Sequence, residues 1–199
     1  MELSESMIQA IGVLHDRLYA TGVPWLVGGS CGLVLQGVPI GREPRDLDVY
    51  VDAPGVEAAF GALKEYTLDS PVHSKTAIYE SVLSHYDLHG AQTELVGGFR
   101  VHAVGAEYAV EIGELLAGFR IRALAGGRQI PLMPLAHELL FNLLRNRPDR
   151  YEAIASVMKR NYILHLPPLF AIIRRNRLTA ELTNKLGELL GLNLNERAE

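Results

Sequence analysis

One short stretch of the chain, residues 24–36, predicts three local structures in immediate succession. Pro24-Trp25-Leu26-Val27 is an apolar run of strand-forming residues, and Gly28-Gly29 interrupts it. Ser30 then precedes residues 31–36, which have the composition of a short helix with Ser30 near its N-cap. The sequence therefore predicts a strand, a tight glycine turn and a helix.

A turn of this kind is suited to binding phosphate. Glycine lets the backbone approach a ligand closely, because it has no Cβ atom. The N-terminus of a helix offers unpaired N–H groups and the positive end of the helix dipole, and the Ser30 hydroxyl can donate a further hydrogen bond. Gly28, Gly29 and Ser30 are therefore candidate nucleotide-binding residues, although Gly-Gly-Ser also occurs in many turns with a purely structural role.

Two aspartates lie on the next predicted strand. Residues 45–51, Arg-Asp-Leu-Asp-Val-Tyr-Val, have the alternation of polar and apolar residues that is typical of a half-buried strand. Asp46 and Asp48 therefore face the same side, with Cα atoms roughly 7 Å apart, and can reach metal ions about 3.5 to 4 Å from one another. Oxygen ligands of this kind suit Mg²⁺ or Mn²⁺. The alternative is a solvated strand face without a ligand.

The order of these motifs resembles the nucleotidyltransferase superfamily with the polymerase-beta-like core. The signature of that superfamily is an apolar strand, then Gly-Gly or Gly-Ser at the start of a helix, then an apolar-flanked Asp-x-Asp or Asp-x-Glu on the next strand. Residues 25–30 and 46–48 match this signature in order and in residue type. The resemblance implies transfer of a nucleoside monophosphate from a nucleoside triphosphate such as ATP to an acceptor hydroxyl, with Mg²⁺ or Mn²⁺ as cofactor.

The loop between the two motifs extends the resemblance. Gly37-Val38-Pro39, together with Arg42 and Arg45, is similar to the loop of the bacterial branch that contains abortive-infection toxins and minimal nucleotidyltransferases. The resemblance implies that Arg45 is one of the nucleotide-binding residues. The loop is somewhat longer than is usual in that branch.

The resemblance also implies a third carboxylate on a later strand of the same sheet. Residues 86–96 have the pattern of a hairpin with Gly90 in its turn, and Glu94 on the second strand is our candidate. Glu111, which lies among apolar residues at 109–112, is the second choice, and Asp87 is the third. The implied set of catalytic and metal-binding residues is therefore Asp46, Asp48 and Glu94.

The remaining pattern predicts an α/β (α+β) fold with a mixed sheet flanked by helices. Apolar spacing predicts one helix between a Ser4 cap and a stop at Gly22, and another that begins at Pro54. Strands are expected over 99–104, 119–124 and 129–132, and regularly spaced leucines from residue 135 onward indicate helices. We therefore expect a nucleotidyltransferase core over residues 1–133 and a helical C-terminal extension over residues 134–199.

Basic residues are concentrated in the predicted extension. Residues 142–178 contain eight Lys and Arg against two Asp and Glu, a local charge of +6, so the rest of the chain carries −10 of the total of −4. This segment could bind the triphosphate, an RNA or a protein partner, or it could be a solvated helical face. No apolar run approaches the roughly 18 residues that span a bilayer, so we expect a cytoplasmic protein without a membrane partner.

Two classes of function are open on this basis. The first is a metal-dependent nucleotidyltransferase that acts on an unidentified hydroxyl of a small molecule, a protein or an RNA. The second is a catalytically silent nucleotide-binding or partner-binding module, including an antitoxin-type component of a toxin–antitoxin pair, because a fold does not imply a function. His137-Glu138 begins like a zinc-protease motif but lacks the second histidine, so it indicates only the first turn of a helix.

Overall fold

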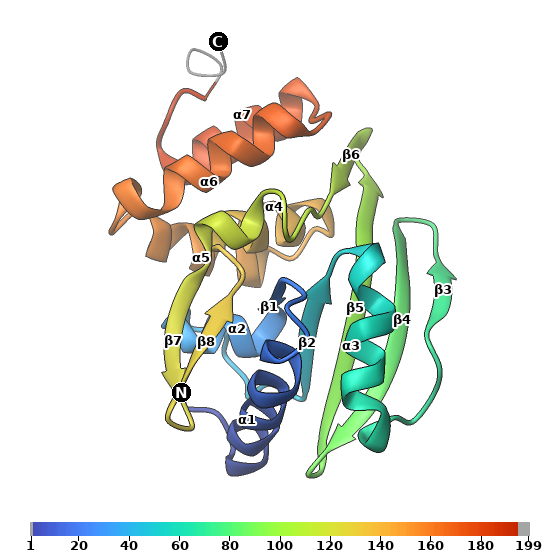
Figure 1. Cartoon of the computed structure of the whole chain (residues 1–199). Helices are drawn as coiled ribbons and strands as arrows, with labels where there is room; N and C mark the ends of the chain where they lie inside the picture. The colour runs from blue at the N-terminus through green and yellow to red at the C-terminus, as the bar shows by residue number, and fades with distance from the viewer. Residues whose placement is uncertain (1, 195–199) are drawn as a thin grey trace.

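The computed structural model describes residues 2–194, which form an open sheet with helices on both sides (Figure 1). The sheet has eight strands in the described residues, in the order β3-β4-β5-β2-β1-β8-β7, with β6 paired to β5. The strands are β1 (Trp25–Val27), β2 (Asp46–Val51), β3 (Val72–Lys75), β4 (Tyr79–Leu88), β5 (Ala91–Ala103), β6 (Ala106–Ala109), β7 (Ile121–Ala125) and β8 (Arg128–Leu132). The helices are α1 (Glu5–Tyr19), α2 (Gly29–Leu35), α3 (Val56–Leu63), α4 (Leu135–Leu144), α5 (Pro148–Met158), α6 (Tyr162–Arg175) and α7 (Ala180–Leu190).

The sheet is mixed, as the sequence predicts. β2 pairs with β5 in parallel and with β1 in antiparallel orientation, and β1 pairs with β8 in parallel. Parallel neighbours require long crossover connections, and the chain between β2 and β5 supplies one that contains α3, β3 and β4. The predicted α/β (α+β) class is therefore confirmed.

Local signals set the ends of several elements. Ser4 caps α1, because its hydroxyl accepts a hydrogen bond from the Met7 N–H at 3.3 Å. The β4–β5 hairpin turns at His89 and Gly90, whose φ angles of 57° and 81° are those of the mirror-image turns that match strand twist. Both features follow the sequence prediction.

Two expected boundaries differ from the structure. The predicted strand over 99–104 is the end of one continuous strand, β5, which runs for 13 residues through Gly97 and Gly98. These glycines make room for neighbours instead of ending the strand, because a Cβ atom on Gly97 would lie 2.1 Å from Val56 Cγ2 of α3. The helix expected at Pro54 begins with a short 3₁₀ turn over Ala53–Gly55 that leads into α3.

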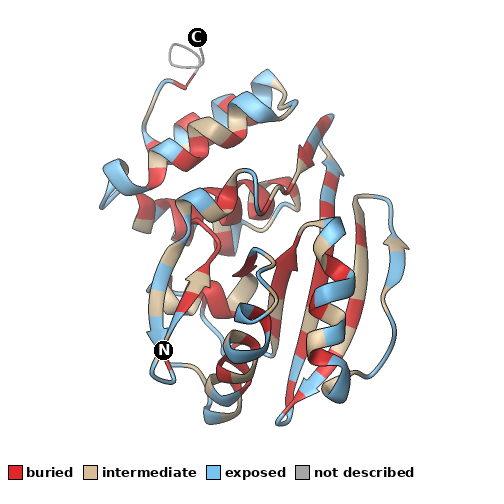
Figure 2. Ribbon diagram, in the orientation of Figure 1, coloured by how far each residue is buried: buried red, intermediate tan, exposed pale blue. Residues whose placement is uncertain are grey.

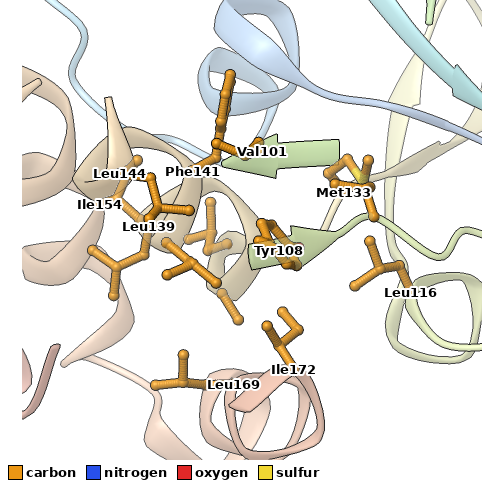
Figure 3. Packing of buried hydrophobic residues seen from close by; sticks show 14 of the residues in the cluster. Val101, Tyr108, Leu116, Met133, Leu139, Phe141, Leu144, Ile154, Leu169 and Ile172 are labelled. Atoms are coloured by element: carbon orange, nitrogen blue, oxygen red, sulfur yellow. The ribbon is translucent and has the colours of Figure 1, made fainter. Parts of the chain in front are cut away.

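Two hydrophobic clusters hold the layers together. One joins α1 and α3 to the sheet and includes Ile11, Leu14, Val49 and Leu63. The other joins α4, α5, α6 and α7 to the ends of β5 and β6, and Figure 3 shows Leu139, Ile154, Leu169 and Ile172 gathered around Tyr108 in it. The outward faces of the helices are largely exposed, as the pale blue surfaces of Figure 2 show.

The second cluster bears on the predicted boundary between residues 133 and 134. Side chains from both sides of that boundary contribute to it, for example Tyr108 and Met133 before it and Leu139 and Leu169 after it. The described part of the predicted extension, residues 134–194, therefore packs directly on the sheet. None of the described helices is long and apolar enough to cross a membrane.

The shared cluster predicts cooperative unfolding of the two parts. Leu169 of α6 is completely buried, so Leu169→Ala should lower the free energy of unfolding by about 2–5 kcal/mol. Calorimetry should record a single transition that moves to lower temperature as a whole. Two transitions, of which only one moves, would indicate instead that the helices after Pro134 fold independently of the sheet.

Candidate active site

A cavity of about 320 Å³ opens beside the paired strands β2 and β5. Three acidic side chains line it, namely Asp46, Asp48 and Glu94. Four arginines from other parts of the chain also line it, namely Arg42, Arg145, Arg147 and Arg150. Carboxylates and guanidinium groups from distant segments therefore meet in one hollow.

Strand pairing brings the three predicted carboxylates together. In the parallel register of β2 and β5, Asp48 lies directly opposite Glu94, and Asp46 lies opposite Gln92. Residues opposite one another on adjacent strands point to the same face of the sheet, and so do residues two apart on one strand. Asp46, Asp48 and Glu94 therefore project from one face into the cavity.

The other two acidic candidates lie outside the cavity lining. Glu111 forms a two-pronged ion pair with Arg175, with N–O distances of 2.8 and 2.9 Å. Asp87 accepts a hydrogen bond from the Gly90 N–H at 2.6 Å, which makes it part of the hairpin turn. Of the three carboxylates considered for the third position, only Glu94 lines the cavity.

Glu94 has a neighbour on the adjacent strand. His85 of β4 pairs with it in the register, and His85 Nε2 lies 3.7 Å from Glu94 Oε1. The other ring nitrogen of His85 lies 2.6 Å from Asp69 Oδ2, which fixes the orientation of the imidazole. No three His, Cys, Asp or Glu side chains within residues 2–194 form a cluster arranged as a metal site, so Glu94 is adjacent to the two aspartates without closing a three-ligand cage.

Asp48 has an unusual electrostatic environment. Burial raises its pKa to about 7, and the negative charges of Asp46, Glu94 and Glu138 contribute to the increase. Over the described part of the chain, neither Asp46 nor Asp48 has a hydrogen bond or ion pair through its side chain. The two aspartates therefore concentrate negative charge at the cavity wall, and the charge of Arg145 offsets only part of the increase in the pKa of Asp48.

The glycine turn is fitted around these carboxylates. A Cβ atom on Gly29 would lie 1.8 Å from Asp48 Oδ2, and one on Gly28 would lie 2.8 Å from the Tyr50 ring and 2.9 Å from Glu138 Oε1. Gly29 also has a φ of 59°, a conformation that glycine adopts readily. Both glycines are therefore required by the packing of neighbouring side chains.

The backbone N–H groups of the turn are already used. The Gly28 N–H donates to the Asp48 carbonyl at 3.1 Å, and the Gly29 N–H donates to Glu138 Oε1 at 2.7 Å. Helix α2 has only seven residues and begins at Gly29, so Gly28 is its N-cap and Ser30 lies within its first turn. The N–H groups of Gly28 and Gly29 themselves are therefore bonded within the protein.

Ser30 instead faces an arginine from a distant helix. The Arg150 Nη2 atom of α5 lies 3.4 Å from Ser30 Oγ, and both residues line the cavity. Arg150 is only 2% exposed, and its Nε has no hydrogen-bond partner among the described residues. Asp149 Oδ2 lies 3.7 Å from this Nε, within ion-pair distance but without a hydrogen bond. A buried guanidinium whose Nε makes no hydrogen bond can attract a further anion.

A second arginine is fixed beside it. Arg145 donates from Nε and Nη2 to Asn142 Oδ1, at 3.1 and 2.8 Å, and its guanidinium lies 4.4 Å from the centre of the Phe141 ring. Arg45, which the resemblance implied as a nucleotide contact, is exposed and does not line the cavity, whereas Arg42 does. The sequence signal for Arg145, Arg147 and Arg150 was the basic excess of residues 142–178.

Comparison with known proteins gave one family and several similar folds. The family model described as aminoglycoside-2''-adenylyltransferase matches residues 10–142. A crystal structure of a protein from Thermotoga maritima assigned to the nucleotidyltransferases has 22% identity and a TM-score of 0.64, over 80% of this chain and 97% of that one. The solution structure of the antibiotic-resistance factor ANT(2'')-Ia has 11% identity and a TM-score of 0.51, over 85% and 92% of the two chains. At sequence identities of 22% and 11%, the likeness to these two structures concerns the fold alone. The search of curated proteins found no match to the sequence.

The contact between Gly29 and Asp48 gives a test of the turn. Gly29→Ala and Gly37→Ala both place a methyl group on a residue with a positive φ. The methyl group of Gly29→Ala would overlap with Asp48, whereas no atom lies within 4 Å of the Cβ that would be added at Gly37. The Gly37 variant should lose about 1–2 kcal/mol of unfolding free energy, and the Gly29 variant should lose about 1–3 kcal/mol more through overlap with Asp48. Urea unfolding of the two proteins measures the difference, and equal losses would show that Asp48 moves aside freely.

Proposed function

The chain belongs to the aminoglycoside-2''-adenylyltransferase family of nucleotidyltransferases, and on this basis we propose that it transfers a nucleoside monophosphate from a nucleoside triphosphate to an acceptor hydroxyl. The superfamily predicted from the glycine turn and the Asp-x-Asp strand is confirmed by the family match. The observation that carries the proposal is the cavity in which Asp46, Asp48 and Glu94 meet four arginines. Such a site can hold both a divalent cation and a polyanionic substrate.

The aspartates have the chemistry of a divalent-cation site. Asp46 and Asp48 offer carboxylate oxygens at the cavity wall, and none of the described residues pairs with their side chains. Hard oxygen donors of this kind suit Mg²⁺ or Mn²⁺. A bound cation would neutralise phosphate charge and lower the pKa of an attacking hydroxyl. Glu94, opposite Asp48 in the register, is the proposed third ligand; its side chain would have to turn toward the cation, because the three carboxylates of the described structure do not by themselves form a metal-type cluster.

The arginines provide the complementary charge. Arg150 and Ser30 form one contact point, and Arg145, held by Asn142, forms a second. The acceptor oxygen would attack the α-phosphorus while the bond to pyrophosphate breaks, so negative charge accumulates on the leaving group. Fixed guanidinium groups stabilise that charge without reorganising, so we propose Arg145 and Arg150 as the residues that bind the leaving phosphates.

This role accounts for part of the basic segment. Of the eight basic residues over 142–178, Arg145, Arg147 and Arg150 line the cavity, and Arg175 pairs with Glu111 and Glu114. The triphosphate is therefore the partner that we propose for this segment in preference to an RNA or a protein. We also propose a cytoplasmic location, because nucleoside triphosphates are abundant in the cytoplasm.

The acceptor would lie against the hairpin side of the cavity. Ser74, Thr76, Tyr79 and Ser81 of the β3–β4 region line it there and offer hydroxyl groups. The name of the family suggests an aminoglycoside hydroxyl as the acceptor. We propose a small hydroxylated molecule as the acceptor class, with aminoglycosides as the first compounds to test.

The two aspartates can be tested together. The double substitution Asp46→Asn and Asp48→Asn should lower nucleotide transfer by at least about a thousandfold, because the oxygen ligands of the cation lose their charge. Transfer can be followed with α-labelled triphosphates, Mg²⁺, and either an aminoglycoside panel or a cell extract separated into protein, RNA and small-molecule fractions. Thermal unfolding should not move to lower temperature, because neither side chain has a hydrogen bond or ion pair within the described residues and the raised pKa of Asp48 means that its ionised form is unfavourable in the folded protein.

The same variant separates the enzyme from a silent binding module. An enzyme should be stabilised by a triphosphate only when Mg²⁺ is present, and the double variant should lose this effect. Stabilisation without metal, retained in the variant, would favour the binding module. Label transfer that persists in the variant would refute the assignment of the aspartates.

Arg150 can be tested by its effect on triphosphate binding. Arg150→Gln removes the guanidinium next to Ser30 and should raise the KM for the triphosphate by about 10- to 100-fold. Arg174→Gln is the matched control, because Arg174 is an exposed arginine of α6 that does not line the cavity. Steady-state kinetics with varied triphosphate measures both, and equal effects would show that Arg150 does not contact the nucleotide.

A further inference from the structure

The first turn of α4 contains a buried carboxylate that the proposed chemistry does not use. Glu138 is 1% exposed, and its Oε2 atom has no hydrogen-bond partner among the described residues. Its Oε1 atom accepts the hydrogen bond from the Gly29 N–H at 2.7 Å. Burying a carboxylate with one oxygen that makes no hydrogen bond lowers the free energy of unfolding. The hydrogen bond between Glu138 and the glycine turn therefore requires an explanation.

That contact lies directly behind the candidate cation site. Gly29 is the residue whose added Cβ would lie 1.8 Å from Asp48 Oδ2, so the Asp48 carboxylate rests against the Gly29 backbone. Glu138 Oε1 is also close to Gly28, because a Cβ atom added to Gly28 would lie 2.9 Å from it. The Glu138 side chain therefore fixes the backbone surface on which Asp48 rests.

Glu138 is connected to the arginine side of the cavity as well. Its backbone carbonyl accepts a hydrogen bond from Asn142 Nδ2 at 2.8 Å, and Asn142 Oδ1 in turn accepts from Arg145. The side chain of Glu138 thus contacts the glycine turn while its carbonyl contacts the residue that holds Arg145. Helix α4 therefore connects the glycine turn, through Glu138, to the arginine side of the cavity, through Asn142 and the C-cap residue Arg145.

We propose that Glu138 is a positioning residue of this site, which holds the Gly29 backbone against Asp48 and thereby sets the affinity of Asp46 and Asp48 for a divalent cation. The inference rests on the proposed function, because it presupposes a cation at these aspartates. Glu138 itself lies behind the turn and does not coordinate the cation. Its effect is transmitted through the hydrogen bond to Gly29 and the contact of Gly29 with Asp48.

Two conservative substitutions separate the contact from the charge. Glu138→Gln keeps an oxygen at the position of Oε1 and loses the charge. Glu138→Asp keeps the charge, but its side chain is one methylene shorter, so its carboxylate withdraws from the Gly29 N–H. Positioning through the hydrogen bond predicts that the Asp variant is impaired and the Gln variant is not, whereas an effect of charge alone predicts the reverse.

The measurement is the binding of Mn²⁺ alone, without nucleotide, followed by electron paramagnetic resonance of the free ion. Glu138→Asp should bind Mn²⁺ at least about tenfold more weakly than the parent protein, and Glu138→Gln should stay within about threefold of it. Glu111→Ala is the control, because Glu111 is an acidic residue outside the cavity that should leave Mn²⁺ affinity unchanged. Circular dichroism and thermal unfolding establish that each variant is folded.

Each other result refutes the inference. An Asp variant with parental affinity, or a Gln variant as weak as the Asp variant, would exclude positioning through the hydrogen bond. An Asp variant that is unfolded would show a purely structural anchor. If Mn²⁺ binding is identical in the parent and in the Asp46→Asn, Asp48→Asn protein, the proposed cation site is itself wrong, and the inference is refuted with it.

Discussion

The parallel pairing of β2 with β5 determines where the charged side chains of this protein meet. In the observed register Asp48 lies opposite Glu94. The cavity-facing side chains of β2 and β5 therefore have fixed positions relative to one another. A slip of one residue would turn Glu94 toward the opposite face of the sheet, which is covered by α1 and α3. The register is held by the buried neighbours Val49 and Leu95, which belong to the cluster under those helices. The hydrophobic packing of one face therefore sets the position of the carboxylates on the other.

Charge in the cavity is arranged as two opposed sets. The carboxylates come from the sheet, and the arginines come from the loop before β2, from the segment that joins α4 to α5 and from the first turn of α5. Neither Asp46 nor Asp48 is paired with an arginine in the described residues, so the aspartates are available to a cation. Arg147 already forms a two-pronged ion pair with Asp149, so Arg145 and Arg150 are the proposed partners of the phosphate groups. In a partly buried cavity these attractions are stronger than they are in water. The same burial explains why the pKa of Asp48 rises to about 7.

Helix α4 connects the two sets of charges. It packs through Leu139 and Leu140 into the hydrophobic cluster that also contains side chains of α5, α6 and α7. Its first turn reaches the glycine turn through Glu138, and Arg145, the C-cap residue that directly follows the helix, lines the cavity. The segment predicted as a C-terminal extension thus contributes side chains to the site itself. This explains why residues far from the Asp-x-Asp strand belong to the candidate active site.

The sequence by itself determined the features that depend on residues close together in the chain. The apolar run, the glycine pair and the alternation around Asp46 and Asp48 predicted β1, α2 and β2, and turn chemistry predicted the hairpin at Gly90. These patterns also indicated the superfamily, which the family match confirms. They did not show that β5 runs unbroken through Gly97 or that Arg42 lines the cavity while Arg45 does not. Only the tertiary structure brought Glu94 to Asp48, Arg150 to Ser30 and Glu138 to Gly29. Arg150 is 120 positions from Ser30, and Glu138 is 109 positions from Gly29. Contacts between such distant residues depend on how the sheet and the helices pack, and they leave no local pattern in the chain.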